Sequence, residues 1–237
     1  MRIIASILSL AVLMWVEAAT AQSSTYSVSV SRHRDVPDLS ESQVKEILAR
    51  ASHMLRKDST RNDRDVSCNV TFTLKGQVGT FDSPNTPVVD EDNIRAFRHV
   101  DPNVAGADFH VKIVKKIKFC RHGLPAGLSA GCSFSPPHFR STILVHPKLH
   151  KDAQGHVLSN YPDHLLWAHE FGHLTGLGHR DDDELALMTR CPLNTQFSNV
   201  PDARVRVNAE ECPRLLAGPG AEAAPPLPGN PRGCRLP

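Results

Sequence analysis

Short runs in which apolar and polar residues alternate predict β-strands in the N-terminal part of the chain. Residues 26–31 read Tyr-Ser-Val-Ser-Val-Ser, which predicts a first strand. Residues 68–74 place Val70, Phe72 and Leu74 on one side and predict a second strand. Each of these strands has one face that can be buried against other elements.

Further strands are predicted in the middle of the chain. The alternating pattern from Phe109 to Phe119 predicts a third strand with its lysines facing outward. Residues 142–145 form a compact apolar strand, and residues 130–134 predict a short, irregular edge strand before it. Residues 76–93 are rich in Gly, Pro, Asp and Asn, which predicts a long loop.

An amphipathic helix is predicted between the first two strands. Ser40 and Gln43 have the spacing of a capping box, in which each side chain satisfies a backbone N–H at the start of a helix. Apolar residues then recur at helical spacing, at Val44, Ile47, Leu48, Ala51 and Leu55. One face of this helix is therefore expected to pack against the sheet.

Two more helices are predicted in the C-terminal half. One begins near Asp163 and carries apolar side chains that include Leu166 and Phe171. A short last helix is expected from Asn208 and Glu211, which again have capping spacing, toward Leu216. This order of elements predicts an α/β (α+β) sandwich with a twisted mixed sheet.

The two ends of the chain differ from the middle. Arg2 precedes an apolar run over residues 3–16, and the small residues Ala-Thr-Ala at 19–21 suit signal peptidase, so residues 1–21 predict a signal peptide. Residues 22–217 are expected to form one domain, and residues 218–237 a Pro/Gly-rich tail. This organisation predicts a secreted protein, periplasmic or extracellular.

The chemistry is concentrated in residues 169–179, which read His-Glu-Phe-Gly-His-Leu-Thr-Gly-Leu-Gly-His. On a helix, His169 and His173 project from one face, one above the other, so both can reach one Zn²⁺ ion. Gly176 can adopt positive φ, end the helix and turn the chain back, which lets His179 supply a third ligand. Three protein ligands with a fourth position open for water are the catalytic form of a zinc site. Glu170 is placed to take a proton from that water.

The spacing of this motif resembles that of the metzincin zinc metalloproteases. A methionine, Met188, follows nine residues after His179. By resemblance it would lie beneath the metal as an apolar floor, and an edge strand would border the cleft above the zinc helix. No tyrosine follows Met188, so the chain is similar to the matrixin-like members rather than to those with a tyrosine ligand.

The resemblance also implies a substrate-binding strand. The candidate residues are those of the predicted edge strand, Ala130, Gly131, Cys132, Ser133 and Phe134. An extended peptide could pair with this strand. The alternative is a surface hairpin held by Cys120 and Cys132.

Unlike the matrixins, the chain has no Pro-Arg-Cys-Gly segment between the signal peptide and the first strand. A separate inhibitor or restricted export would then have to control activity.

Six cysteines lie beyond the signal segment, and an even count in an exported chain predicts three disulfides. Closeness in sequence favours pairing Cys120 with Cys132 and Cys191 with Cys212. Cys68 and Cys234 are then left for each other.

The sequence gives weaker evidence for other kinds of binding site. The net charge of +2 gives no argument for nucleic acid or an anionic membrane surface. The run Asp181–Asp182–Asp183 offers oxygen ligands for Ca²⁺ but lacks the pattern of a dedicated calcium loop, so a solvated acidic turn is favoured. Histidines outside the motif, His138, His146, His150 and His156 among them, match no second zinc template.

The sequence therefore predicts a secreted, monomeric zinc metalloendopeptidase that acts on protein or peptide substrates, with Glu170 as general base. Two alternatives stay open. One is a secreted zinc-holding module without proteolysis, against which the retained Glu170 argues. The other is a zinc peptidase that acts on cell-wall peptides, which the sequence does not separate from protein cleavage.

Overall fold

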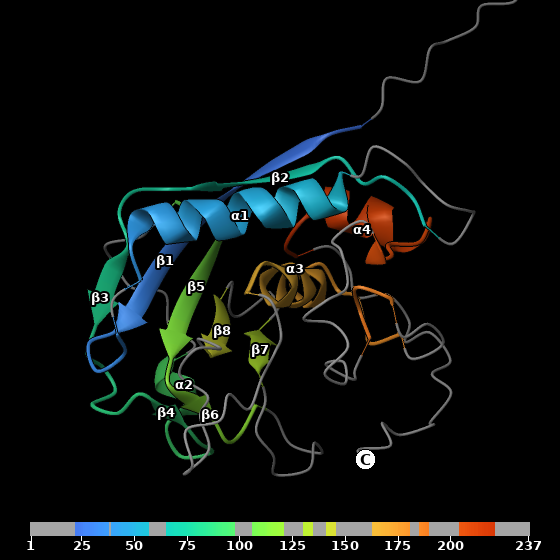
Figure 1. Cartoon of the computed structure of the whole chain (residues 1–237). Helices are drawn as coiled ribbons and strands as arrows, with labels where there is room; N and C mark the ends of the chain where they lie inside the picture. The colour runs from blue at the N-terminus through green and yellow to red at the C-terminus, as the bar shows by residue number, and fades with distance from the viewer. Residues whose placement is uncertain are drawn as a thin grey trace, which may run out of the picture.

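The computed structural model describes residues 22–37, 39–56, 65–97, 106–120, 130–134, 141–145, 163–180, 185–189 and 204–220. Within these ranges the chain is a mixed α/β structure, with helices packed on a twisted sheet (Figure 1). Several predictions fall outside them: the signal peptide, the acidic run at 181–183, Cys191 and Cys234, the four histidines named above, and most of the tail.

The main sheet is mixed, as the order of elements predicts. Its strands are β1 (Ser24–His33), β2 (Val70–Leu74), β3 (Gly79–Phe81), β5 (Phe109–Val114), β7 (Gly131–Phe134) and β8 (Ser141–Val145). They follow the spatial order β2-β1-β5-β8-β7, with β3 paired beside β2 on the same side of β1. All pairs are parallel except β7 with β8, which is antiparallel. The predicted edge strand is thus present, and it forms the end of the described sheet.

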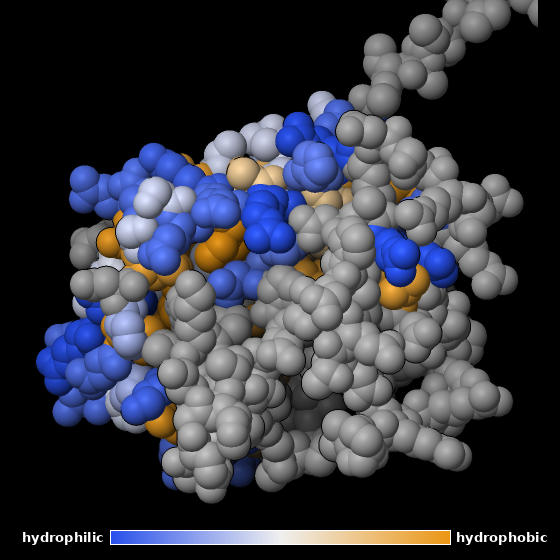
Figure 2. Space-filling view, viewed as in Figure 1, coloured by the Kyte–Doolittle hydropathy of each residue, from blue (hydrophilic) through white to orange (hydrophobic). Residues whose placement is uncertain are grey.

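Helix α1 (Glu41–Leu55) forms as its capping pattern predicts. The Gln43 backbone N–H donates to Ser40 Oγ at 3.2 Å, and the Ser40 N–H donates to Gln43 Oε1 at 2.9 Å. Val44 and Leu48 are buried on its inner face. Its outer side belongs to the mainly hydrophilic surface in Figure 2, where hydrophobic residues show only in gaps.

Helix α3 (Asp163–Leu174) packs on the same face of the sheet as α1 (Figure 1). Phe171 is fully buried at the centre of this contact. Its ring lies 5.0 Å from Tyr26 of β1, 4.8 Å from Phe72 of β2 and 5.2 Å from Phe109 of β5, measured between centroids. Burial of one such side chain stabilises a fold by about 1.5–3 kcal/mol, and the aromatic contacts add to this. Because Phe171 lies between His169 and His173 in sequence, the same contacts fix the turn that carries both histidines.

Helix α4 (Glu211–Ala217) completes the described fold. Asn208 Oδ1 accepts the N–H of Glu211 at 2.8 Å, and Glu211 Oε2 accepts the N–H of Asn208 at 2.9 Å, so the predicted reciprocal cap is present. The Tyr26 hydroxyl donates to the Leu216 carbonyl at 2.6 Å and attaches the helix to β1.

The disulfides agree with the predictions in one case only. Cys120 is bonded to Cys132, as predicted. Cys68 is bonded to Cys212, so the predicted pairs Cys191–Cys212 and Cys68–Cys234 are both wrong. The reason is topological: α4 returns to the start of β2 and brings together cysteines 144 residues apart, which closeness in sequence could not reveal.

The predicted loop over residues 76–93 is in part ordered structure, so this prediction was wrong in detail. It contains β3 and β4 (Val88–Val89), and α2 (Ile94–Phe97) follows directly. Strand β4 pairs with β6 (Lys116–Ile117) in a small separate sheet. These short elements pack a second apolar cluster that includes Phe81, Phe97 and Ile117. Runs this short show no periodicity that a sequence pattern could detect.

The prediction that all lysines of the third strand face outward was also wrong. Lys112 is 1% exposed, and its Nζ lies 4.9 Å from the centroid of the Phe81 ring. Every residue of β5 is buried, because parallel neighbours flank it and both of its faces are covered.

Within the described ranges, none of the helices combines the length and apolarity that crossing a membrane requires.

Candidate metal centre

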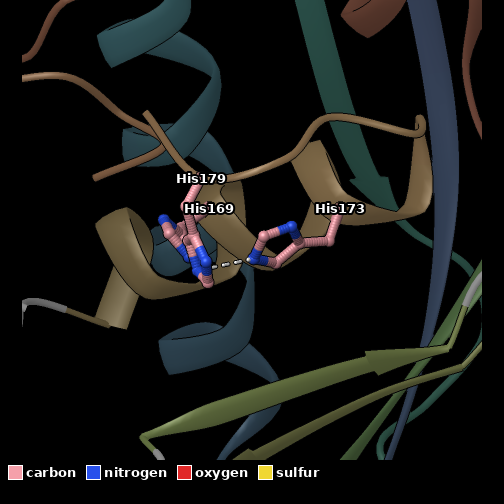
Figure 3. Close-up of side chains that lie close together, drawn as sticks. All are labelled: His169, His173 and His179. Carbon is pink, nitrogen blue, oxygen red and sulfur yellow. Dashed lines mark hydrogen bonds between the residues drawn. The ribbon is translucent and has the colours of Figure 1, made fainter. Parts of the chain in front are cut away.

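Three histidine side chains converge at one point beside α3. Their ligand atoms all lie within 4.8 Å of one another. In Figure 3 the rings of His169 and His173 extend from the helix, and His179 reaches the same point from the segment that follows it. The ring centroids are 4.8 Å apart for His169 and His173, and 4.6 Å for His173 and His179. The spacing read from the sequence therefore corresponds to a real cluster.

The turn at Gly176 makes this convergence possible. Gly176 has φ of +84°, a left-handed conformation that strains residues with a side chain. Its N–H donates to the His173 carbonyl at 3.1 Å, and the Leu177 N–H donates to the Gly172 carbonyl at 3.0 Å. These two bonds form a Schellman motif, which ends the helix and reverses the chain. The predicted helix end at this glycine is present.

Two backbone carbonyls set the orientation of two of the rings. His169 Nδ1 donates to the Leu187 carbonyl at 2.7 Å, and His173 Nδ1 donates to the Leu177 carbonyl at 2.8 Å. A carbonyl can only accept, so in both rings Nδ1 carries the hydrogen and Nε2 presents its lone pair. This is how proteins prepare metal-binding histidines.

The distances and ionisation of the cluster fit a zinc ion. His173 Nε2 and His179 Nε2 are 3.2 Å apart. Two ligands at about 2.0–2.1 Å from a tetrahedral zinc are about 3.3 Å from each other. Burial lowers the pKa of His169 well below its ordinary value, and the neighbouring His173 lowers it further, so His169 is neutral as a ligand must be. His169, His173 and His179 can therefore hold a metal ion.

Glu170 lies in a buried position between α3 and the edge strand. The Ser133 hydroxyl contacts its carboxyl oxygen Oε2 and also lies 2.9 Å from its backbone carbonyl. A Cβ atom built on Gly131 would overlap the carboxyl group of Glu170, so a side chain at position 131 would displace this carboxyl. Burial raises the pKa of Glu170 to about 7, and the Ser133 hydrogen bond opposes that rise. A carboxyl with a pKa near neutrality can both accept and return a proton.

The methionine turn, residues 185–189, packs against α3. Met188 is fully buried, and a Cβ on Gly172 would lie 2.3 Å from its Sδ atom. Its neighbour Leu187 supplies the carbonyl that orients His169. The turn therefore packs against the helix at Gly172, the residue before His173, and it also holds the ring of His169.

The five candidate substrate-binding residues have three kinds of surroundings. Cys132 and Phe134 are buried in the second apolar cluster, and Cys132 is in a disulfide. Gly131 and Ser133 face Glu170, and Ala130 packs against the main core. Any pairing of β7 with a peptide would therefore use its backbone.

Several contributors to the site were missed by the sequence analysis. Gly172 and the carbonyls of Leu177 and Leu187 gave no signal, because backbone acceptors have no sequence signature. Gly131 and Ser133 were selected only as parts of a strand. Their alternation with the buried Cys132 and Phe134 would have placed them on a common face.

No protein-family model and no curated protein sequence matches the chain. Among solved structures, metalloproteinase-II from Bacteroides fragilis is similar over 84% of this chain and 54% of its own, with 16% identity and a TM-score of 0.48. This chain thus spans about half the length of that protein. Archaemetzincin from Methanopyrus kandleri is similar over 81% of this chain and 94% of its own, with 14% identity and a TM-score of 0.45. At TM-scores below 0.5 neither similarity establishes a family, so the assignment of a metal site rests on the geometry of the three histidines.

Proposed function

We propose that the protein is a secreted zinc-dependent endopeptidase. The observation that carries this proposal is the set of three convergent imidazoles, two of them with Nδ1 bound to a backbone carbonyl, together with the buried carboxyl of Glu170, the residue after His169. A purely structural zinc site has four protein ligands and no use for such a carboxyl. The geometry of a three-ligand site next to Glu170 supports hydrolysis.

The roles of the residues follow from their positions. His169, His173 and His179 would hold the ion, which when bound supplies a Lewis acid that polarises the scissile carbonyl and makes water more acidic. Glu170 takes the proton from the attacking water and returns it to the departing amine. Its raised pKa suits both transfers, because it lies near the working pH. Ser133 and Gly131 keep the carboxyl between the strand and the helix.

The finer assignment, a metzincin of matrixin type, is part of the proposal. It is supported by the turn at Gly176, the buried Met188 beneath the helix and the strand β7 at the end of the sheet. We propose that a peptide substrate pairs with the outer edge of β7 through backbone hydrogen bonds. Secretion is supported by the predicted signal peptide and by two disulfides, which persist in oxidising compartments.

The test is to quantify zinc in the purified mature protein and to measure cleavage of an unfolded protein substrate in the same preparation. We expect about one zinc ion per chain, loss of cleavage when a chelator removes it, and recovery when zinc is returned. Cleavage that persists in metal-free protein would refute the proposal.

A further inference from the structure

Arg180, the residue that follows the third histidine, forms a buried ion pair with Glu211. Arg180 Nε lies 3.0 Å from Glu211 Oε1, and the two side chains are 6% and 3% exposed. Charges this deeply buried are expensive to desolvate, and a buried pair often adds little net stability. A function other than stability is therefore worth seeking for it.

Arg180 connects the third histidine to the methionine turn. Its backbone N–H donates to the Met188 carbonyl at 2.7 Å. The preceding carbonyl of that turn, that of Leu187, accepts from His169. The methionine turn therefore accepts one hydrogen bond from the ring of His169 and another from the backbone of Arg180, the residue next to His179.

Glu211 provides a fixed point for the other end of the pair. Its second carboxyl oxygen, Oε2, accepts the Asn208 N–H, and the next residue, Cys212, is disulfide-bonded to Cys68 at the start of β2. The chain before α4 also holds the methionine turn, because the Leu187 N–H donates to the Arg206 carbonyl at 2.8 Å. Glu211 is thus attached to two separate parts of the fold.

His179 depends on such support more than the other two histidines do. His169 and His173 lie on a regular helix that Phe171 fixes to the sheet. His179 lies after the helix, in a stretch with no regular secondary structure. The position of His179 therefore depends on the contacts of its neighbours in the chain, such as those of Arg180.

We propose that Arg180 and Glu211 are positioning residues for His179, and that their ion pair determines how long the protein retains its zinc. The inference rests on the zinc site of the proposed function but not on peptidase activity. Loss of a group that orients a metal ligand typically costs about 10–100-fold in metal affinity.

Variants of the two charged residues can distinguish a positioning role from a purely electrostatic effect on zinc binding. Arg180 is a cation next to a metal ligand, so by charge alone its removal should strengthen zinc binding and removal of the Glu211 charge should weaken it. If the pair positions His179, either removal weakens binding. Arg180→Met is therefore the decisive variant, since Met retains much of the length of the side chain without the charge.

The experiment measures the rate at which zinc passes from the loaded protein to an excess of a chromogenic chelator. We expect Arg180→Met and Glu211→Gln each to release zinc about 10–100-fold faster than wild type. Because one unpaired buried charge can prevent folding, the double variant Arg180→Met/Glu211→Met removes both charges and should also release zinc faster. Val44→Ala, a core truncation in α1, is the control for general destabilisation and should stay within about twofold of wild type.

Wild-type release rates in Arg180→Met and in the double variant would overturn the inference and leave the proposed zinc site standing. Acceleration by Val44→Ala as large as that by Arg180→Met would also overturn it, because general destabilisation would then explain the effect. A wild-type protein that binds no zinc would overturn both the inference and the proposed function.

Discussion

The Ser133 hydroxyl of the edge strand lies within hydrogen-bonding distance of both the backbone carbonyl and the carboxyl group of Glu170. A hydroxyl has one hydrogen to donate, so the two contacts cannot both be donated bonds. When Glu170 is ionised, the hydroxyl donates to one oxygen or the other. When Glu170 is protonated, its own O–H can donate to Ser133, which then donates to the carbonyl. Ser133 therefore has a suitable partner in either state of the carboxyl.

Replacing Ser133 with Ala should impair catalysis without loss of metal. The carboxyl would lose the contact that holds it over Gly131, and misplacement of a catalytic group by about 1 Å can cost up to about a hundredfold in rate. We expect kcat to fall by about 10–100-fold with zinc content unchanged. Because the Ser133 bond lowers the pKa of Glu170, its loss should also move the acid limb of the pH–rate profile to higher pH.

Ser133→Thr is the matched control for this change. It retains the hydroxyl and suits a strand, so we expect most of the activity to remain. Equal activity in the Ala and Thr variants, both close to wild type, would show that the hydroxyl does not position Glu170.

Two glycines of the motif should respond differently to Ala. In an unconstrained helix Gly→Ala would stabilise by about 1 kcal/mol, but a Cβ on Gly172 would lie 2.3 Å from Met188 Sδ. We expect Gly172→Ala to lower the free energy of unfolding by about 1–3 kcal/mol, because the fully buried Met188 side chain must move.

Gly178→Ala provides the comparison within the same motif. A Cβ there has no neighbour within 4 Å, so the free energy of unfolding should change by less than about 0.5 kcal/mol. Both variants can be compared by chemical denaturation of metal-free protein. A Gly172→Ala variant as stable as Gly178→Ala would contradict the close contact with Met188.

The buried carboxyl of Glu170 should make metal-free protein less stable at alkaline pH. Its pKa is about 7 when folded against an ordinary value of 4.5, so the folded state prefers the protonated form. The contribution of Glu170 to the free energy of unfolding is most favourable below pH 4.5. As the pH rises to 7, this contribution falls by about 3 kcal/mol at most.

The amide side chain of the Glu170→Gln variant cannot ionise, so this variant should not lose stability as the pH rises. We expect the metal-free variant to be more stable than metal-free wild type at pH 8 and similar to it at pH 4.5, as measured by denaturant unfolding at both values. A stability difference that does not change with pH would contradict the raised pKa.

Much of the fold was predictable because its signals are local. The capping box at Ser40, the alternation along β1 and the histidine spacing of residues 169–179 each depend on a few neighbouring residues. The turn at Gly176 was predictable for the same reason, since a helix cannot otherwise return a third histidine to the same point.

The parts that were not predictable depend on contacts between distant segments. The Cys68–Cys212 disulfide joins residues 144 positions apart, and closeness in sequence gave the wrong partners. Lys112 is buried because of what covers its strand, which its own sequence does not encode. The carbonyls of Leu177 and Leu187 are backbone groups, so no residue type identifies their role at the histidines.

The most direct test of the account compares wild type with Glu170→Gln in peptide hydrolysis, with zinc quantified in the same samples. Gln has nearly the same shape as Glu but cannot accept the proton of the attacking water. We expect both proteins to carry about one zinc ion and the variant to lose at least about a hundredfold in kcat. Wild-type turnover in a zinc-loaded Glu170→Gln variant would contradict the central claim that Glu170 is the general base of a zinc peptidase.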